Sequence, residues 1–451
     1  MRPGSGVEVR HRDSIETGDA ASGGNVGGQD DDGQAQAIAA RLMQRLDLLA
    51  DCTDTPGHGL SRLFLSPAHR RAVDLVGGWM REAGLSVRMD AAASLIGELA
   101  GPTPGVPVLL VGSHLDSVRD GGRFDGNLGV LGGLAALELL HARGVVLPFG
   151  VLLLAFGDEE GVRFPVTLTG SRALAGTLDI ERQLAATDAD GISLAEALSA
   201  FDGDPDGLST ARIAGPVLGF VELHIEQGPV LEQAGLALGI VTAINGAGRY
   251  RLLVEGEAGH AGTVPMASRR DALAAAAEML VAIRRIALGL QDVTATIGRI
   301  EVQPGAVNVI PGQAMFTLDL RAPLDTDRTK AWNAIRADIG AIAQAHGVRL
   351  AIEPVHDAPA APCDTALQSR LEQACAAEGV ATRRLPSGAG HDAMAMASLC
   401  PIAMLFVRCK GGISHTPAEA IQAGDAALGV RVLARLLQSW IPDRSAQVSR
   451  W

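Results

Sequence analysis

The chain has 451 residues, of which 47% are hydrophobic and 20% charged, and its formal net charge is −13. This length exceeds what one hydrophobic core usually fills, so we expect two folded domains. The composition is that of a globular protein. The acidic balance, without a Lys/Arg-rich block, argues against nucleic acid or an anionic membrane as the main partner.

Cysteine usage and the absence of long apolar runs indicate the compartment. The chain has five cysteines, an odd number, and no Cys-x-x-Cys motif. This pattern argues against a disulfide framework and favours a reducing compartment. No apolar run approaches the roughly 20 residues of a membrane helix, and the start lacks the apolar core of a signal peptide. We therefore expect a cytoplasmic protein with a disordered N-terminal extension over residues 1–36, which are rich in Gly, Asp, Ser and Arg.

Strands and helices alternate through most of the chain. Apolar spacing predicts helices over residues 37–49, 68–83, 130–142, 366–379 and about 418–440, and strands over 86–89, 95–99, 106–111, 151–156 and 402–407. A further strand ends within residues 219–228, and 178–214 should form short helices and loops. This order predicts an α/β fold with a mixed sheet covered on both faces, formed by residues 37–235 and 357–451.

Residues 236–356 follow a different pattern, β-β-α-β-β-α-β. Strands are predicted over 238–244, 250–254, 294–302, 314–320 and 348–354, and helices over 268–286 and 326–345. The Asn245-Gly246 pair is a turn signal that would join the first two strands in a hairpin. The order is close to a ferredoxin-like α+β unit, so we expect a small inserted domain.

Five potential metal ligands fall at strand ends or in Gly-rich loops of the larger domain: His114, Asp125, Glu160, His224 and His415. Ligand sites of α/β sheets form at that edge. Imidazole and carboxylate groups are ligands that zinc, manganese and cobalt accept. Five ligands are one too many for a closed tetrahedral site, but they suit two ions that share a carboxylate.

The remaining polar candidates have alternative explanations. Glu159, beside Glu160, could take a proton from a metal-bound water, although an acidic turn alone could be a solvated surface feature. His260 could be a turn histidine, and Arg321 either a surface ion-pair partner or a bidentate clamp for a carboxylate. Asn308 and Gln227 could simply satisfy the local backbone.

Eight ordered motifs resemble the hydantoinase/carbamoylase family of dinuclear metallohydrolases. They are GSHLDS at 112–117, GRFDG at 122–126, EEGVRF at 159–164, ELHIEQG at 222–228, GHAGTVP at 259–265, NVIPG at 308–312, SGAGHDA at 387–393 and GGISH at 411–415. The likeness covers nearly everything after the N-terminal extension. The family includes N-carbamoyl-L-amino acid hydrolases, allantoate amidohydrolases and β-ureidopropionases.

The resemblance implies a catalytic domain like that of zinc aminopeptidases, a lid domain that also forms a homodimer, and two divalent ions, Zn or Mn. It implies that His114 and His224 bind different ions, that Asp125 bridges, and that Glu160 and His415 complete the ligand set. It also implies that Asp116 orients His114 and that Glu159 is the general base. His260 would stabilise the oxyanion from the partner subunit's lid. Arg321 and Asn308 would hold the substrate carboxylate, and the pocket would be lined by Gln227, Gly390 and His391.

The resemblance also implies hydrolysis of a ureido group with release of an amine, ammonia and carbon dioxide. The segment FGDEEGVRF at 156–164 looks more like the allantoate branch, so we expect allantoate, with N-carbamoyl-L-amino acids or N-carbamoyl-β-alanine as the alternative. Allantoate has two ureido arms, and its pocket needs further polar donors that the sequence does not identify. A dinuclear aminoacylase or exopeptidase is a second alternative, disfavoured by the motifs at 163–164 and 226–228. A metal-binding or dimerisation protein without catalysis is disfavoured because Glu159 accompanies the full ligand set.

Overall fold

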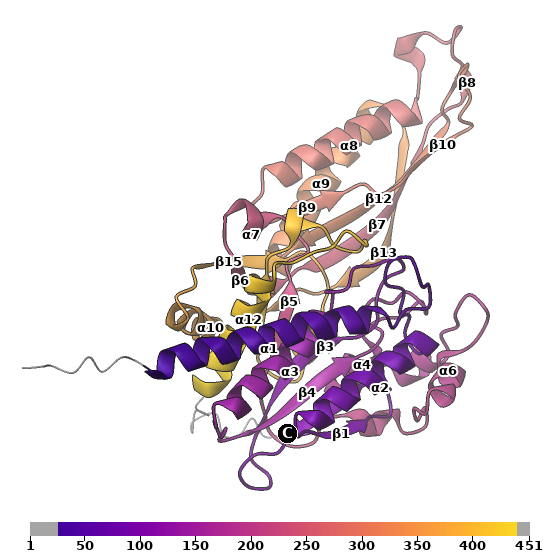
Figure 1. Cartoon of the computed structure of the whole chain (residues 1–451). Coiled ribbons are helices and arrows are strands. Elements are labelled where there is room, and N and C mark those ends of the chain that lie inside the picture. Colours follow the sequence, from indigo (N-terminus) through magenta and orange to yellow (C-terminus); the bar gives the residue numbers. More distant parts are fainter. Residues whose placement is uncertain (1–25, 440–451) are drawn as a thin grey trace, which may run out of the picture.

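The computed structural model describes residues 26–439, which form a large mixed sheet and a smaller antiparallel sheet (Figure 1). The large sheet contains β1 (Ser86–Met89), β2 (Leu95–Leu99), β3 (Val108–His114), β4 (Gly150–Phe156), β5 (Val217–Ile225), β6 (Leu238–Ile244), β14 (Ala361–Pro362), β15 (Thr382–Ser387) and β16 (Ile402–Val407). Its order is β1-β2-β4-β3-β5-β16-β6-β14, and β15 also pairs with β6. The predicted mixed α/β architecture is confirmed.

Helices cover both faces of the large sheet, as predicted. One face packs against α1 (Val26–Ala50), α2 (Pro67–Glu82), α3 (Asn127–Ala142), α10 (Thr365–Ala377) and α12 (Ala423–Ser439), and the other against α4 (Thr169–Ala175) and α11 (Asp392–Met396). Short helices α5 (Ile180–Leu184), α6 (Leu194–Ala200), η1 (Leu208–Ala211), α7 (Val230–Gln233) and η3 (Lys410–Gly412) occupy connections. Helix α1 begins at Val26, so the extension expected through residue 36 is wrong from that residue onward, and residues 1–25 lie outside the described residues.

Four neighbouring strands run parallel and bring their carboxyl ends to one edge. β3 pairs in parallel with β4 and β5, and β5 pairs in parallel with β16. β4 and β16 are buried along their whole length, which explains why their sequences are apolar on both faces. The shared edge is where loops from distant parts of the chain meet.

The predicted hairpin across Asn245-Gly246 is wrong. β6 pairs with β14, β15 and β16, whereas β7 (Gly246–Glu255) pairs with β12 (Gln313–Ala322) and β13 (Arg349–Ala358) in the smaller sheet. The chain therefore crosses between sheets at this point instead of turning back. As a result, β6 belongs to the large sheet, and a boundary at Gly246 fits the sheets better than the expected one at residue 236.

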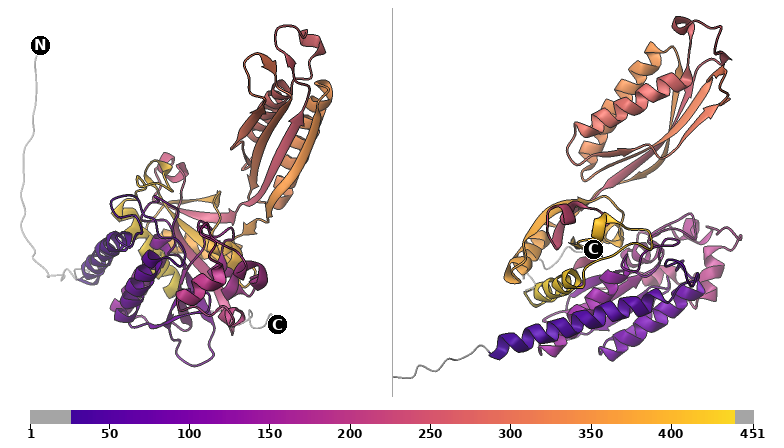
Figure 2. Two further views of the ribbon diagram at one scale, coloured as in Figure 1. Left: turned by 90° about the vertical axis from the view of Figure 1, so that its right-hand side faces the viewer. Right: turned by 45° about the horizontal axis from the view of Figure 1, so that its top comes forward.

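The smaller unit has its own hydrophobic core and projects from the larger one (Figure 2). Its sheet has the order β10-β12-β7-β13, with β9 beside β12, and one face is covered by α8 (Ala272–Leu288) and α9 (Asp325–Ala345). The strand predicted over 294–302 is two strands, β9 (Thr294–Thr296) and β10 (Ile300–Gln303). A separate two-stranded sheet, β8 (Gly259–His260) with β11 (Val309–Ile310), lies at the distal end. The short helix η2 (Met266–Ser268) follows β8 in the chain.

Among residues 26–439, the structure contains no helix with the length and apolar character needed to cross a membrane.

Because the smaller unit has its own hydrophobic core, we expect a cavity made in that core to lower the free energy of unfolding. Ile335 is 0% exposed, so Ile335→Ala should lower the free energy of unfolding by about 2–5 kcal/mol. Val281 on α8 is 71% exposed, so Val281→Ala should change it by less than about 0.5 kcal/mol. Urea unfolding followed by circular dichroism measures both, and equal effects would contradict the assignment of this core.

Candidate active site

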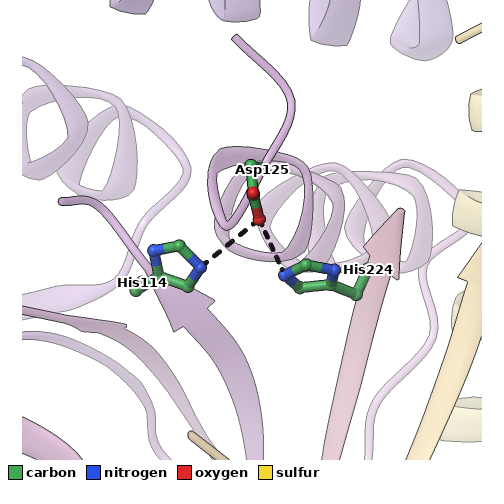
Figure 3. A group of neighbouring side chains, drawn as sticks. All are labelled: His114, Asp125 and His224. Carbon is green, nitrogen blue, oxygen red and sulfur yellow. Dashed lines mark ion pairs between the residues drawn. The ribbon is translucent and has the colours of Figure 1, made fainter. Parts of the chain in front are cut away.

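The predicted ligands meet at the carboxyl edge of the large sheet. His114 ends β3, Glu160 follows β4, His224 lies near the end of β5, and His415 follows β16 through η3. Asp125 lies just before α3 and faces the imidazoles of His114 and His224 (Figure 3). All five line one cavity of about 510 Å³, together with Glu159.

The Asp125 carboxylate is the centre of this cluster. Its Oδ1 lies 3.3 Å from His224 Nε2 and 3.7 Å from His114 Nε2, and its Oδ2 lies 3.2 Å from His415 Nε2. Glu160 Oε2 lies 3.8 Å from the same His415 nitrogen. A carboxylate that presents one oxygen to each group of ligands has the form expected of a bridge between two ions.

These distances change the expected division of the ligands. The resemblance implied that His114 and His224 bind different ions, but both imidazoles approach the same oxygen of Asp125. Their nitrogens and Asp125 lie within 4.8 Å of one another, and Asp125, Glu160 and His415 form a second such group. The shared oxygen favours pairing His114 with His224, and Glu160 with His415, while His114 also forms such a group with Glu159 and Glu160.

Hydrogen bonds fix which imidazole nitrogen faces the centre. His114 Nδ1 donates to the Asp116 carbonyl oxygen at 2.9 Å, and His224 Nδ1 donates to the Ile225 carbonyl oxygen at 2.9 Å. A carbonyl only accepts, so in each neutral ring the Nε2 atom carries the free lone pair. Both histidines thus present a ligand atom to Asp125, with the outer support that metal-bound histidines generally have.

Orphaned buried atoms show that the donor set fits divalent cations. His224 Nε2 and Glu160 Oε1 are buried and have no hydrogen-bond partner. Leaving such groups unpaired is costly unless an ion or water satisfies them. Imidazole nitrogens with carboxylate oxygens suit Zn or Mn better than the all-oxygen sites that Ca²⁺ and Mg²⁺ prefer.

The charges of the cluster are strongly coupled. Burial alone would raise the pKa of Asp125, but the neighbouring imidazoles of His114, His224 and His415 hold it well below its ordinary value. Burial raises the pKa of Glu159 well above its usual range, and His114 only partly offsets this. Burial also raises the pKa of Glu160 to about 7, with Asp125 adding repulsion. Burial of several carboxylates together therefore favours a site that binds cations.

Asp116 supports the site by two routes. Its carbonyl oxygen orients His114, as described above, while its carboxylate accepts the backbone N–H groups of Glu159 and Glu160, each at 3.1 Å. The carboxylate is 3.8 Å from His114 Nδ1 and so is not its closest acceptor. Asp116 thus links the end of β3 to the loop that carries both glutamates.

The cavity also contains most of the predicted substrate residues. Gln227 Nε2 donates to Asp125 Oδ2 at 2.9 Å, and the His391 ring lies edge-on against His224 with centroids 4.5 Å apart. Gly390 lines the same wall. Arg321 reaches across from the smaller unit, where its Nη1 donates to the Gly388 carbonyl at 2.7 Å. Asp319 holds the rest of this guanidinium at 2.7 and 3.0 Å.

His260 and Asn308 lie away from the cavity in their own chain. They belong to the distal β8–β11 region, where Ala261 N–H donates to the Asn308 carbonyl at 3.0 Å (Figure 1). Both side chains are exposed. Within one chain, therefore, Asn308 is not brought together with Arg321, the residue with which it was expected to hold a carboxylate.

Other buried charged residues around the cluster were not assigned roles from the sequence. Glu222 and Asp392 lie behind His224 and His391, and burial raises the pKa of Asp392 to about 8. Glu222 could have been suspected because it precedes His224 by two positions and thus shares its face of the strand. Arg62 is fully buried, and its Nε donates to the Leu115 carbonyl at 2.6 Å.

Glu419 ties two ligand segments together. Its Oε1 accepts the backbone N–H groups of Phe124 at 2.8 Å and Asp125 at 3.1 Å, while Oε2 accepts the Ser414 hydroxyl at 2.8 Å. The residue is 2% exposed. Nothing in the sequence indicates this, because the segments that it joins are almost 300 positions apart.

Known proteins share this fold and sequence. The model of peptidase family M20/M25/M40 matches residues 110–439. An N-carbamoyl-L-amino acid amidohydrolase from Geobacillus stearothermophilus is 46% identical over 87% of this chain and 96% of its own length, and an allantoate deiminase from Arabidopsis thaliana is 40% identical over 86% and 80%. The crystal structure of a hydantoinase/carbamoylase family amidase from Burkholderia ambifaria has a TM-score of 0.82 at 37% identity, over 88% of this chain and 96% of that one.

The chain therefore belongs to peptidase family M20/M25/M40 and, within it, to the hydantoinase/carbamoylase amidases. The resemblance seen in its motifs is confirmed. It is a hydrolase with a buried His/Asp/Glu cluster suited to metal ions.

The contacts of Glu419 predict an effect on metal affinity. Glu419→Ala removes the acceptor that positions the backbone of Asp125, and loss of such outer support typically weakens metal binding about 10–100-fold. Glu419→Gln, which retains an acceptor oxygen, should lose less. Isothermal titration of the metal-stripped protein with Zn²⁺ measures this. Glu372→Ala, at an exposed ion pair with Arg384, is the control, and an equal loss there would contradict the role.

Proposed function

We propose that the chain hydrolyses the terminal ureido group of a small ureido carboxylic acid, using two divalent ions, Zn or Mn. The observation that carries the proposal is the Asp125 carboxylate, with His114 and His224 at one oxygen and His415 at the other. Relatives that act on N-carbamoyl-L-amino acids and on allantoate support a ureido substrate.

The ligand groups assign the ions in this proposal. His114, His224 and Asp125 would hold one ion, and Asp125, Glu160 and His415 the other. When bound, such ions lower the pKa of a water between them and stabilise negative charge on the attacked carbonyl oxygen.

Glu159 is the proton carrier of the proposal. Its Oε2 lies 3.9 Å from His114 Nε2, so the carboxylate faces the ligand atoms without belonging to the Asp125 group. A raised pKa makes the carboxylate a stronger base than an exposed glutamate. Glu159 takes a proton from the attacking water as the bond to the ureido carbon forms. It then returns the proton to the leaving nitrogen as that C–N bond breaks. The carbamic acid that remains loses carbon dioxide, so the products are an amine, ammonia and carbon dioxide.

We assign His260 to the oxyanion in the partner's site. The Gly262 N–H donates to His260 Nδ1 at 3.0 Å, so the neutral ring carries its proton on Nε2, where it can donate to an oxyanion. The tip that carries His260 and Asn308 exposes Met266 at 77% and Val307 at 105%. Apolar side chains at an exposed tip suit contact with a second copy, and a homodimer would bring both polar residues to the other copy's cavity.

Two substrates compete within the ureido class. The segment at 156–164 favours allantoate, whereas the 46% identity to the Geobacillus stearothermophilus enzyme favours an N-carbamoyl-L-amino acid. Both carry a carboxylate that Arg321 could bind at the cavity wall. Peptide hydrolysis, which the family name suggests, is the alternative function that belongs to a different reaction type.

An assay panel tests the reaction. We expect ammonia release from at least one of allantoate, an N-carbamoyl-L-amino acid and N-carbamoyl-β-alanine, and no release of free amino acids from a dipeptide. Glu159→Gln should lower kcat by about 10²–10⁴-fold, because it removes the proton carrier. Chelation should abolish activity, and added Zn²⁺ or Mn²⁺ should restore it. Dipeptide cleavage without ureido hydrolysis would overturn the proposal, as would full activity of Glu159→Gln with the same metal content.

Subunit complementation tests the position of His260. His260→Ala and Glu159→Gln homodimers should both be nearly inactive. A heterodimer of the two should regain about half the activity of the wild-type dimer, because one of its two sites has Glu159 from one chain and His260 from the other. Differently tagged, co-expressed chains provide the sample, and co-expressed His260→Ala chains provide the control. A heterodimer no more active than its parents would contradict action from the partner subunit.

A further inference from the structure

One cation in the active-site cavity has no partner. Besides the residues described above, the cavity is lined by Arg172, Arg249 and His356. Arg249 Nε donates to Asp319 at 2.9 Å, and the same carboxylate holds Arg321. The Arg172 guanidinium, by contrast, makes no hydrogen bond or ion pair with any of residues 26–439.

The helix that carries Arg172 is attached to the loop of the two glutamates. Arg172 lies on α4, whose flanking residues Ser171 and Ala173 are buried. The Leu168 N–H donates to the Asp158 carbonyl at 2.6 Å, and the Gly170 N–H donates to the Gly157 carbonyl at 3.2 Å. The first turn of α4 is therefore attached to the loop that carries Glu159 and Glu160.

The surroundings of Arg172 favour an electron-rich ligand. Arg172 is solvent-exposed at the cavity, where partial desolvation and the nearby Arg182 both lower its pKa, and no described carboxylate pairs with it. The preceding loop contributes Pro165, Val166, Thr167 and Leu168 to the wall of the same cavity. A guanidinium against such a wall binds a carboxylate or carbonyl oxygen in a fork, and it is left unpaired by an apolar group.

We propose that Arg172 determines specificity by binding an oxygen acceptor on the arm of the substrate that is not cleaved. This inference rests on the proposed ureido hydrolysis. Arg321, on the smaller unit, would hold the carboxylate common to all ureido acids, while Arg172, on the larger unit, binds the variable arm. The acceptor is the second ureido carbonyl in allantoate or a side-chain carboxylate in an acidic N-carbamoyl-L-amino acid. Substrates with apolar side chains leave Arg172 unpaired and are disfavoured.

The test compares three substrates that differ in this arm: allantoate, N-carbamoyl-L-aspartate and N-carbamoyl-L-leucine. Arg172→Met should lower kcat/KM by about 10–100-fold for at least one acceptor-bearing substrate, the cost of losing a charged hydrogen bond, mainly through KM. For N-carbamoyl-L-leucine it should change less than about threefold or rise. Arg182→Met removes an exposed neighbouring charge outside the cavity and should leave all three values within about twofold.

The outcomes separate this inference from the proposed function. Loss confined to allantoate identifies the ureido carbonyl as the acceptor, and loss confined to N-carbamoyl-L-aspartate identifies the carboxylate. An equal loss on all three substrates, or no loss, overturns the role of Arg172 while the ureido hydrolysis of the wild-type enzyme stands. A wild-type enzyme inactive on all three overturns both. Unchanged metal content and melting temperature of Arg172→Met verify that the variant is folded.

Discussion

The arrangement of the large unit depends on one buried carboxylate surrounded by imidazoles. Asp125 lies within 3.7 Å of nitrogens from His114, His224 and His415, which come from segments spread over about 300 positions. Four parallel strands can deliver these side chains because their carboxyl ends meet at one edge. Gly126, with φ +65°, completes the fit, since a Cβ there would lie 2.5 Å from the His114 ring.

Charge balance explains why this edge suits cations. Behind the ligands lie further buried carboxylates, Asp116, Asp158, Glu222 and Asp392, whose pKa values burial raises. The buried guanidinium of Arg62 is occupied by the Leu49 and Leu115 carbonyls and by Asn127. So many carboxylates around so few cations would be destabilising in an apolar interior unless protons or metal ions compensate them. Two dications would serve this structural need as well as the chemistry.

Local sequence patterns predicted what depends on local structure. Residues 86–89, 95–99 and 402–407 are strands with the expected bounds, because their apolar runs end in turn residues. The ligand set was also accessible, since polar residues directly after apolar strands fall at one edge of a parallel sheet. The hairpin at Asn245-Gly246 was mispredicted because the local sequence does not show which strands pair. Two consecutive strands with a turn signal between them have the same pattern whether they pair together or enter different sheets. Glu419 gave no signal, because its role depends on segments that only the tertiary fold brings near.

Arg321 and Arg172, the two arginines proposed to bind the substrate, lie on different units of the molecule. Arg321, the expected carboxylate clamp, lies on the smaller unit, where Asp319 and Gly388 already occupy much of its guanidinium. Arg172 instead lies on α4, attached to the loop of Glu159. A substrate that contacts both arginines must span the two units, with its variable arm tested by the rigid unit that performs the chemistry. Discrimination of that arm then does not require movement of the lid, because the base and the unpaired cation belong to one hydrogen-bonded segment.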